Sequence, residues 1–296
     1  MLRKMLVIKE RNLLLWKHHF DNKMVAWVKN ANNKKRAAPE ELQRLYQSSG
    51  KLYAEKSPVA PFNNDLIEKD LFVKFYKKRF KEDVEESDED FKRLFNNLML
   101  LNNNNLNLAG ALLFSKNAQT LIPEFYITII WFWGNEFLTN DYRSSENIYG
   151  NIYQQYKNTY NFILSTLHKI QNDKSFNSIG DSEIPEIVIS ELLINAIVHR
   201  DYFINDSIKV FVFENRIEIK SPGKLPNNLT VAEIKQGLQR RSRNIILTSY
   251  AIDMLPYRGT GSGILKSLQA YPNIEFVNNV ESEFFKVIIY RPELKR

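Results

Sequence analysis

One segment restricts the fold more than any other: the apolar run that follows Pro185. Glu191, Asn195 and His199 occur in it at four-residue intervals, and most residues between them are Ile, Val, Leu or Ala. Residues at i and i+4 lie one above the other on the same face of a helix. The sequence therefore predicts an apolar helix with a single polar line along it.

The first two polar residues of this line suit a nucleotide site. A magnesium ion takes oxygen ligands, usually only one or two from protein, and phosphates and water fill the other positions. The Asn195 carbonyl can be such a ligand, and a neighbouring carboxylate such as Glu191 can orient or deprotonate a water molecule. The pair therefore points to a nucleoside triphosphate.

A second segment, Gly259-Thr-Gly-Ser-Gly263, precedes another predicted helix. Alternating glycines leave backbone N–H groups accessible at a helix N-terminus, where the helix dipole favours an anion such as phosphate. A flexible turn is the other reading of such a motif taken alone. The order of segments favours the phosphate site, because a polar helix, a hairpin and a Pro-Gly turn come before the glycines.

Composition excludes several other kinds of site. The chain has no cysteine, which rules out disulfides, thiolate catalysis and Cys-based zinc sites, and it lacks the G-x-x-x-x-G-K-[ST] motif of P-loop proteins. The net charge of +7 suits a polyanionic partner, although Lys- and Asn-rich proteomes also produce many basic proteins. No apolar run reaches the roughly 18 residues of a membrane span, so we expect a cytoplasmic protein with no membrane partner.

The pattern of apolar residues predicts an α+β fold. From residue 182 onward, it predicts the helix of the polar line, a hairpin of strands at 208–213 and 216–220, helices at 230–236, 243–255 and 263–270, and strands at 275–277 and 283–290. Upstream, it predicts strands at 24–28, 108–114 and 125–132, and helices at 39–46, within 65–101 and at 150–169. Residues 171–180 form the expected domain boundary. The downstream part is predicted to be a sandwich of helices on a mainly antiparallel sheet.

Several motifs occur in one order in the downstream part. They are Glu191, Asn195 and Ala196 with His199-Arg200-Asp201-Tyr202, then Arg216-Ile-Glu-Ile-Lys-Ser221-Pro-Gly-Lys-Leu-Pro226, Arg243-Asn244 and Gly259-Thr-Gly-Ser-Gly-Ile264. This order resembles the GHKL-type (Bergerat) ATPase fold. More narrowly, it resembles the divergent ATP-binding module at the C-terminal end of RecG-like transcriptional regulators. The resemblance is specific over residues 182–291 and weaker upstream.

The resemblance also implies a domain organisation. In this family a Schlafen-type AlbA domain, the nucleic-acid binder, precedes the ATP-binding module. Residues 1–60 would be a remnant of that domain, 61–180 a helical and α/β connecting domain, and 181–296 the GHKL-like ATP-binding domain. Only the last strand and helix of the AlbA domain are recognised, so we expect an N-terminally shortened product.

The resemblance implies ATP and Mg²⁺ as cofactors. It assigns Asn195 to the metal and Glu191 to the role of general base. The residues that it assigns to nucleotide binding are Asn195, His199, Arg200, Ser221, Gly223, Gly259, Gly261 and Gly263. Ser221 stands where typical GHKL proteins have an Asp that contacts the adenine amino group, so a charge-assisted hydrogen bond is replaced by one to a hydroxyl.

The sequence leaves more than one role open for each of three basic segments. His199, Arg200 and Asp201 either clamp phosphates or are structural, with a cationic His199 at the helix end and Asp201 paired with Arg200. Residues 240–243 form a nucleotide lid, a DNA contact or a solvated surface. Residues 77–79 contact nucleic acid or form a solvated helix face, and the acidic run beside them favours the solvated face.

Three functions remain open from the sequence. The first is an ATP-binding transcriptional regulator in which nucleotide changes DNA binding, with weak ATP hydrolysis resting on Glu191 alone. The second is a DNA-binding regulator whose nucleotide site has degenerated. The third is an interaction scaffold that self-associates into a homo-oligomer.

Overall fold

The computed structural model divides the chain into two compact units, Met1–Tyr53 and Ala54–Arg296. It describes residues 7–10, 13–16, 27–30, 33–48, 50–84, 87–137, 141–171, 180–226, 229–238, 242–257, 259 and 261–293. The expected boundary at 171–180 falls inside the second unit, and most of it lies outside the described residues. The unit therefore contains both of the regions that the sequence placed at 61–180 and 181–296.

The first unit contains two antiparallel strand pairs and one helix. Strands β1 (Val7–Glu10) and β2 (Leu13–Trp16) pair with each other, as do β3 (Trp27–Asn30) and β4 (Asn33–Arg36). Helix α1 (Pro39–Ser48) confirms the predicted helix, with Pro in the first turn where its missing N–H costs nothing. Of the strand expected at 24–28, residues 24–26 lie outside the described residues.

The centre of the second unit is a six-stranded sheet in the order β14-β15-β13-β12-β8-β9. Its strands are β8 (Ile127–Phe132), β9 (Tyr142–Ile148), β12 (Ile208–Val212), β13 (Arg216–Pro222), β14 (Ile274–Asn279) and β15 (Phe284–Tyr290). Only the β8–β12 pair is parallel. The predicted α+β fold class is confirmed, but the upstream strands β8 and β9 extend the same sheet.

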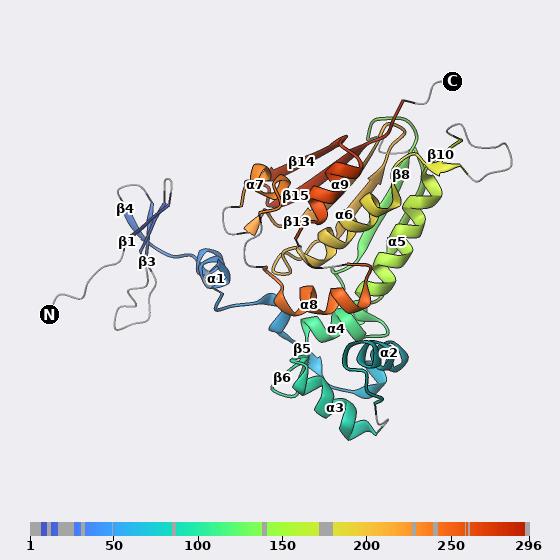
Figure 1. Ribbon diagram of the computed structural model, residues 1–296. Helices are drawn as coiled ribbons and strands as arrows, with labels where there is room; N and C mark the ends of the chain where they lie inside the picture. Colours follow the sequence, from blue (N-terminus) through green and yellow to red (C-terminus); the bar gives the residue numbers. More distant parts are fainter. Residues whose placement is uncertain are drawn as a thin grey trace. The chain divides into compact units, whose positions relative to one another are not determined.

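Helices α5 (Ile152–Thr166), α6 (Glu186–Val198) and α9 (Gly263–Ala270) form the layer over one face of this sheet (Figure 1). Helix α6 is apolar on almost all sides, as expected of a helix between other elements, and Leu193, Ile194 and Val198 have no exposed surface. Short helix α7 (Val231–Lys235) contacts β14, and β10 (Lys169–Ile170) pairs with β11 (Asp181–Ser182). None of the helices in the described ranges is long and apolar enough to cross a membrane.

A second layer lies below the sandwich in Figure 1 and is built around phenylalanines. Its elements are η1 (Ala54–Lys56), β5 (Pro58–Pro61), η2 (Asn64–Leu66), α2 (Lys69–Phe80), α3 (Asp88–Asn97), β6 (Leu101–Asn102), β7 (Asn105–Asn107), α4 (Leu108–Phe114) and η3 (Ala118–Thr120). Phe72 is at the centre, with the ring centroid of Phe95 4.7 Å and that of Phe114 5.1 Å away. Such aromatic pairs add to the apolar area that the cluster buries.

Helix α8 (Ile245–Met254) joins the two layers (Figure 1). Tyr250 stacks on Phe75 at 4.9 Å, and its hydroxyl donates to the Leu98 carbonyl. The Arg79 guanidinium lies 4.9 Å from the Tyr250 ring and donates to Ser249 Oγ. Arg79 is therefore part of the packing between α2 and α8, whereas Lys77 and Lys78 are exposed, as expected of a solvated helix face.

The prediction of a strand at Leu108–Phe114 is wrong, because this segment is helix α4. The side chain of Asn107 accepts a hydrogen bond from Gly110 N and caps the helix. All residues of α4 are buried and apolar. Its sequence therefore has no alternation of apolar and polar residues with the period of a helix. A short apolar run of this kind fits a buried helix as well as a buried strand.

Candidate functional site

A pocket of about 210 Å³ opens between α6, the ends of β13–β15, α7 and the turn before α9. This volume is far more than one water molecule needs. All of the predicted site residues except Arg200 line it: Glu191, Asn195, His199, Ser221, Gly223, Gly259, Gly261 and Gly263. Segments that are far apart in sequence therefore converge on one cavity.

Most of the remaining lining is apolar and was not predicted as part of a site. It consists of Leu192, Ala196, Ile219, Leu225, Leu229, Ile234, Leu238, Ile264, Phe276, Phe285 and Val287. The alternation of side chains along β13 and β15 indicates which residues point toward the helices. It could not indicate that these residues border a cavity rather than a filled core. A few polar groups in an apolar cavity are typical of a small-molecule site.

Glu191 and Asn195 contact each other on α6, as their spacing predicts. Asn195 Nδ2 donates to the Glu191 backbone carbonyl at 2.8 Å and to Glu191 Oε1 at 3.0 Å. Because the amide nitrogen donates to Glu191, Oδ1 is the oxygen of Asn195 that remains for a ligand. Burial raises the pKa of the Glu191 carboxyl, while the Asn195 hydrogen bond and the charge of Lys266 act in the opposite direction.

The glycine turn lies directly against this pair. A Cβ atom on Gly263 would overlap the Glu191 carboxyl group, so a larger residue here would displace that side chain. Gly259 and Gly261 have φ values of +63° and +72°, which glycine adopts at little cost. The first turn of α9 and the carboxylate of Glu191 therefore border the same part of the pocket.

Ser221 lies at the end of β13 and is buried. Its hydroxyl donates to the Ala196 carbonyl of α6 at 2.9 Å. Since a hydroxyl has one hydrogen and two lone pairs, a ligand in the pocket meets Ser221 Oγ as a hydrogen-bond acceptor.

Arg200 does not line the pocket. It is 2% exposed, its guanidinium donates to the carbonyls of Ile204 and Asp206, and it lies 4.7 Å from the ring of Phe125. These contacts hold the loop between α6 and β12. We therefore do not include Arg200 among the nucleotide contacts that we propose below.

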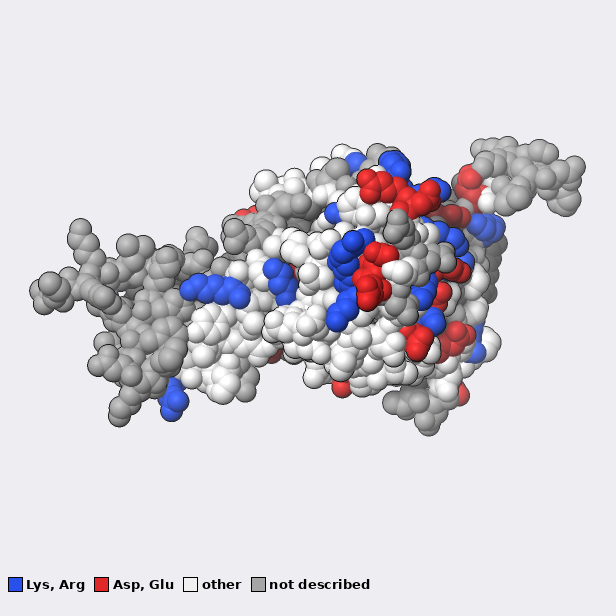
Figure 2. Space-filling view, turned by 90° about the horizontal axis from the view of Figure 1, so that it is seen from below, with Lys and Arg blue, Asp and Glu red and all other residues white. Residues whose placement is uncertain are grey.

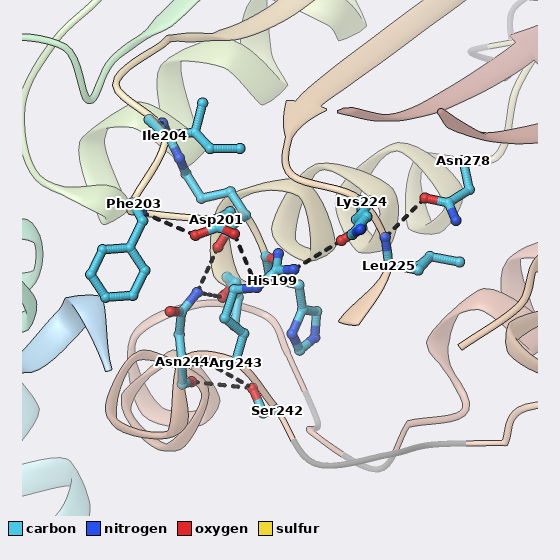
Figure 3. Close-up of polar contacts among 12 residues, drawn as sticks. His199, Asp201, Phe203, Ile204, Lys224, Leu225, Ser242, Arg243, Asn244 and Asn278 are labelled. Carbon is cyan, nitrogen blue, oxygen red and sulfur yellow. Dashed lines mark hydrogen bonds and ion pairs between the residues drawn. The ribbon is translucent and has the colours of Figure 1, made fainter. Parts of the chain in front are cut away.

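Asp201 forms an ion pair with Arg243, whose Nε lies 3.7 Å from Asp201 Oδ2, and its charge also interacts with that of Arg200. Arg243 also donates to the carbonyls of His199 and Lys224, so it lies among these three residues (Figure 3). Gly223 fits beside them with φ +100°, and a Cβ there would be 2.5 Å from Asp201 Cβ. Arg243 is thus a structural clamp between the end of α6 and the turn after β13. The neighbouring residues 239–241 lie outside the described residues.

His199 is neutral in this environment. Burial and the nearby Arg243 lower its pKa to about 4, which disfavours the cationic form that one of the two alternatives placed at the C-cap of α6. Its Nε2 lies 3.4 Å from the Tyr257 hydroxyl, and burial raises the pKa of Tyr257 to about 12. Tyr257 also lines the pocket and was not predicted, although it stands just before the glycine segment.

Comparisons with known proteins agree with part of the resemblance. Residues 205–289 match a family model described as "Putative ATP-dependent DNA helicase recG C-terminal". The match supports a GHKL-like, ATPase-type module in this region. It begins after α6, so it does not include Glu191 or Asn195. No curated protein matches the chain significantly.

A solved structure has a similar fold. The crystal structure of the DIP2311 protein from Corynebacterium diphtheriae superposes with a TM-score of 0.58 at 16% sequence identity. The match covers 92% of this chain and 54% of that chain, so this chain spans about half the length of the protein it matches. The AlbA remnant at residues 1–60 and the other expected domain limits stay predictions.

Proposed function

We propose that the second unit binds ATP together with magnesium in the pocket beside α6. One observation carries the proposal: the polar line of α6, the end of β13 and the glycine turn before α9 border one cavity. Each supplies a different kind of contact, to the metal, to the base and to the phosphates. The family match over residues 205–289 supports an ATP-binding module independently.

The apolar part of the pocket suits an adenine base. The apolar side chains of Ile219, Phe276 and Val287 line the cavity and can cover the ring. Ser221 Oγ, whose hydrogen is given to Ala196, accepts a hydrogen bond from the amino group of adenine. Guanine has a carbonyl at the corresponding position, which would face the Ser221 lone pairs, so we expect ATP to bind better than GTP.

The phosphates would lie at the glycine turn and the N-terminus of α9, where backbone N–H groups and the helix dipole favour anions. Asn195 Oδ1 would hold a magnesium ion, which supplies positive charge next to the phosphates when it is bound. One protein ligand is sufficient for this, because phosphate oxygens and water provide the others. No group of three or more His, Asp or Glu residues that could hold a metal ion lies among the described residues.

We propose weak ATP hydrolysis, with Glu191 as general base. A base is most effective when its pKa is near the working pH, and burial raises the pKa of Glu191 in that direction. Asn195 Nδ2 fixes the position of the carboxylate. A Glu191→Ala variant should bind ATP but lose at least about 100-fold in turnover, the usual contribution of a general base. An unchanged turnover rate, measured as phosphate release, would eliminate this role.

The nucleotide site is tested by thermal unfolding with and without millimolar magnesium-ATP. A ligand at about 100 times its dissociation constant adds roughly 2.7 kcal/mol to stability, which corresponds to about 5–10 °C in a unit of this size. We expect this shift in the parent, a smaller one with GTP, and none in Asn195→Ala. A folded parent protein without any shift would contradict the proposal.

We further propose that nucleotide binding regulates contact with DNA, as the family resemblance implies. The net charge of +7 is compatible with a polyanion. Figure 2 shows Lys and Arg mixed with Asp and Glu on the face it presents, so we do not place the DNA contact there. The second candidate is a DNA-binding regulator with a degenerate nucleotide site, favoured by Ser221 in the place of an Asp. It predicts salt-sensitive DNA binding that magnesium-ATP does not change.

A further inference from the structure

Glu55 is a buried residue whose carboxylate caps a helix far away in the sequence. It has no exposed surface and belongs to η1, at the start of the second unit. Its two carboxylate oxygens accept hydrogen bonds from the backbone N–H groups of Ile246 and Leu247, each at 2.9 Å. These N–H groups lie in the first turn of α8, where a helix has no internal acceptors for them.

Helix α8 needs this distant carboxylate because its own cap residue is used elsewhere. Asn244 precedes the helix but makes no side-chain cap bond. Instead, its Nδ2 donates to the carbonyls of Val198 and Arg200 at the end of α6, each at 2.9 Å. Glu55 therefore supplies the hydrogen-bond acceptors for the first turn of α8, and the Asn244 side chain connects α8 to α6.

The residues fixed in this way form one side of the pocket. Ser242 and Thr248 line it and bond to each other at 2.9 Å. Arg243, directly before Asn244, holds the His199 and Lys224 carbonyls, and both of those residues also line the pocket. Tyr257, Gly259 and Gly261 follow the other end of α8. A shift of α8 would therefore move the pocket lining on both sides of the helix.

We propose that Glu55 is a positioning residue for the nucleotide site, which it sets through α8 without contacting the ligand. The inference rests on the proposed nucleotide binding. Glu55 does not line the pocket, so its effect on affinity is carried by Arg243, Asn244 and Thr248. Its place in the chain also links the site to the point where the second unit begins, two residues from the end of the first unit at Tyr53.

The test compares Glu55→Gln with a control of similar stability. Glutamine keeps the size of the side chain but replaces one acceptor by an NH₂ group, which cannot bond to a backbone N–H. The control is Phe91→Leu, in the phenylalanine cluster and outside the pocket lining. Magnesium-ATP affinity is measured at a temperature at which thermal unfolding shows both variants to be fully folded. We expect about tenfold weaker binding in Glu55→Gln, because only a fraction of the molecules would then hold α8 and the pocket wall in the arrangement that binds the ligand, and parent affinity in Phe91→Leu.

A second measurement separates this inference from the proposed function. Hydrogen exchange of the ligand-free proteins should be faster in Glu55→Gln at the first turn of α8 and also in peptides that contain Lys224 and Tyr257. Parent-like affinity in Glu55→Gln would overturn the positioning role while leaving nucleotide binding in place. If the parent protein bound no nucleotide, the proposed function would fail. Hydrogen exchange alone would then test the positioning role of Glu55. Faster exchange in Glu55→Gln that is confined to α8 would overturn that role.

Discussion

At the scale of single residues, some polar and small side chains around the pocket hold its walls in place, and others face its interior, where a ligand would bind. Gly223 is the clearest case, since both its φ of +100° and its close approach to Asp201 exclude a larger residue. Arg243 and Asp201 complete the same contact. The motif residues after β13 therefore maintain the shape of the pocket, whereas Ser221 and Asn195 present atoms to its interior.

Gly223→Ala tests this structural role. The methyl group would meet Asp201 Cβ at 2.5 Å and Arg243 at 2.9 Å, in a backbone conformation that alanine rarely adopts. Left-handed strain costs about 1–2 kcal/mol and overpacking about 1–3 kcal/mol. We expect a total loss of about 2–5 kcal/mol in the free energy of unfolding, measured by denaturant titration.

Gly134→Ala is the matched control for this prediction. Gly134 also has a positive φ, +73°, but a Cβ there would meet no atom within 4 Å. Its substitution should cost only the backbone strain, about 1–2 kcal/mol. Equal losses in the two variants would show that the contact with Asp201 and Arg243 contributes nothing.

At the scale of helices and strands, local signals predicted most of the downstream part. Thr230 and Glu233 form a capping box that begins α7, and the alternating residues of β12 and β13 predicted their hairpin. The four-residue spacing of Glu191 and Asn195 predicted their contact. Each of these signals lies within one turn or one strand pair, so the sequence contains it directly.

The features that the sequence did not predict depend on contacts between distant segments. The residues of α4 are buried on all sides by other elements, so they carry no periodicity that would separate a helix from a strand. The cap of α8 comes from Glu55, and the ion pair of Asp201 with Arg243 joins two distant segments. The parallel pairing of β8 with β12 also joins distant segments, and only the folded sheet reveals it. Spacing along the chain could not identify these pairs.

At the scale of the whole molecule, the start of the second unit is part of its structure. The two compact units meet between Tyr53 and Ala54, and the limit of the AlbA remnant at residue 60 stays a prediction. The intervening segment contains buried Ala54 and Glu55. Residues 54–56 therefore belong with α8 and the pocket, and a cut at residue 60 would remove a cap from inside the unit.

Two shortened chains test this boundary. A chain that begins at Gly50 keeps Glu55, so we expect it to unfold cooperatively and to keep the stabilisation by magnesium-ATP. A chain that begins at Ser57 keeps the bond from Leu108 N to the Ser57 carbonyl but leaves the N–H groups of Ile246 and Leu247 without Glu55. Loss of a buried charged acceptor costs about 1.5–3 kcal/mol, which lowers the melting temperature by about 3–12 °C in a unit of this size. Equal melting temperatures for the two chains would place residues 54–56 outside the folded unit, because a segment that stabilises α8 cannot be removed without effect.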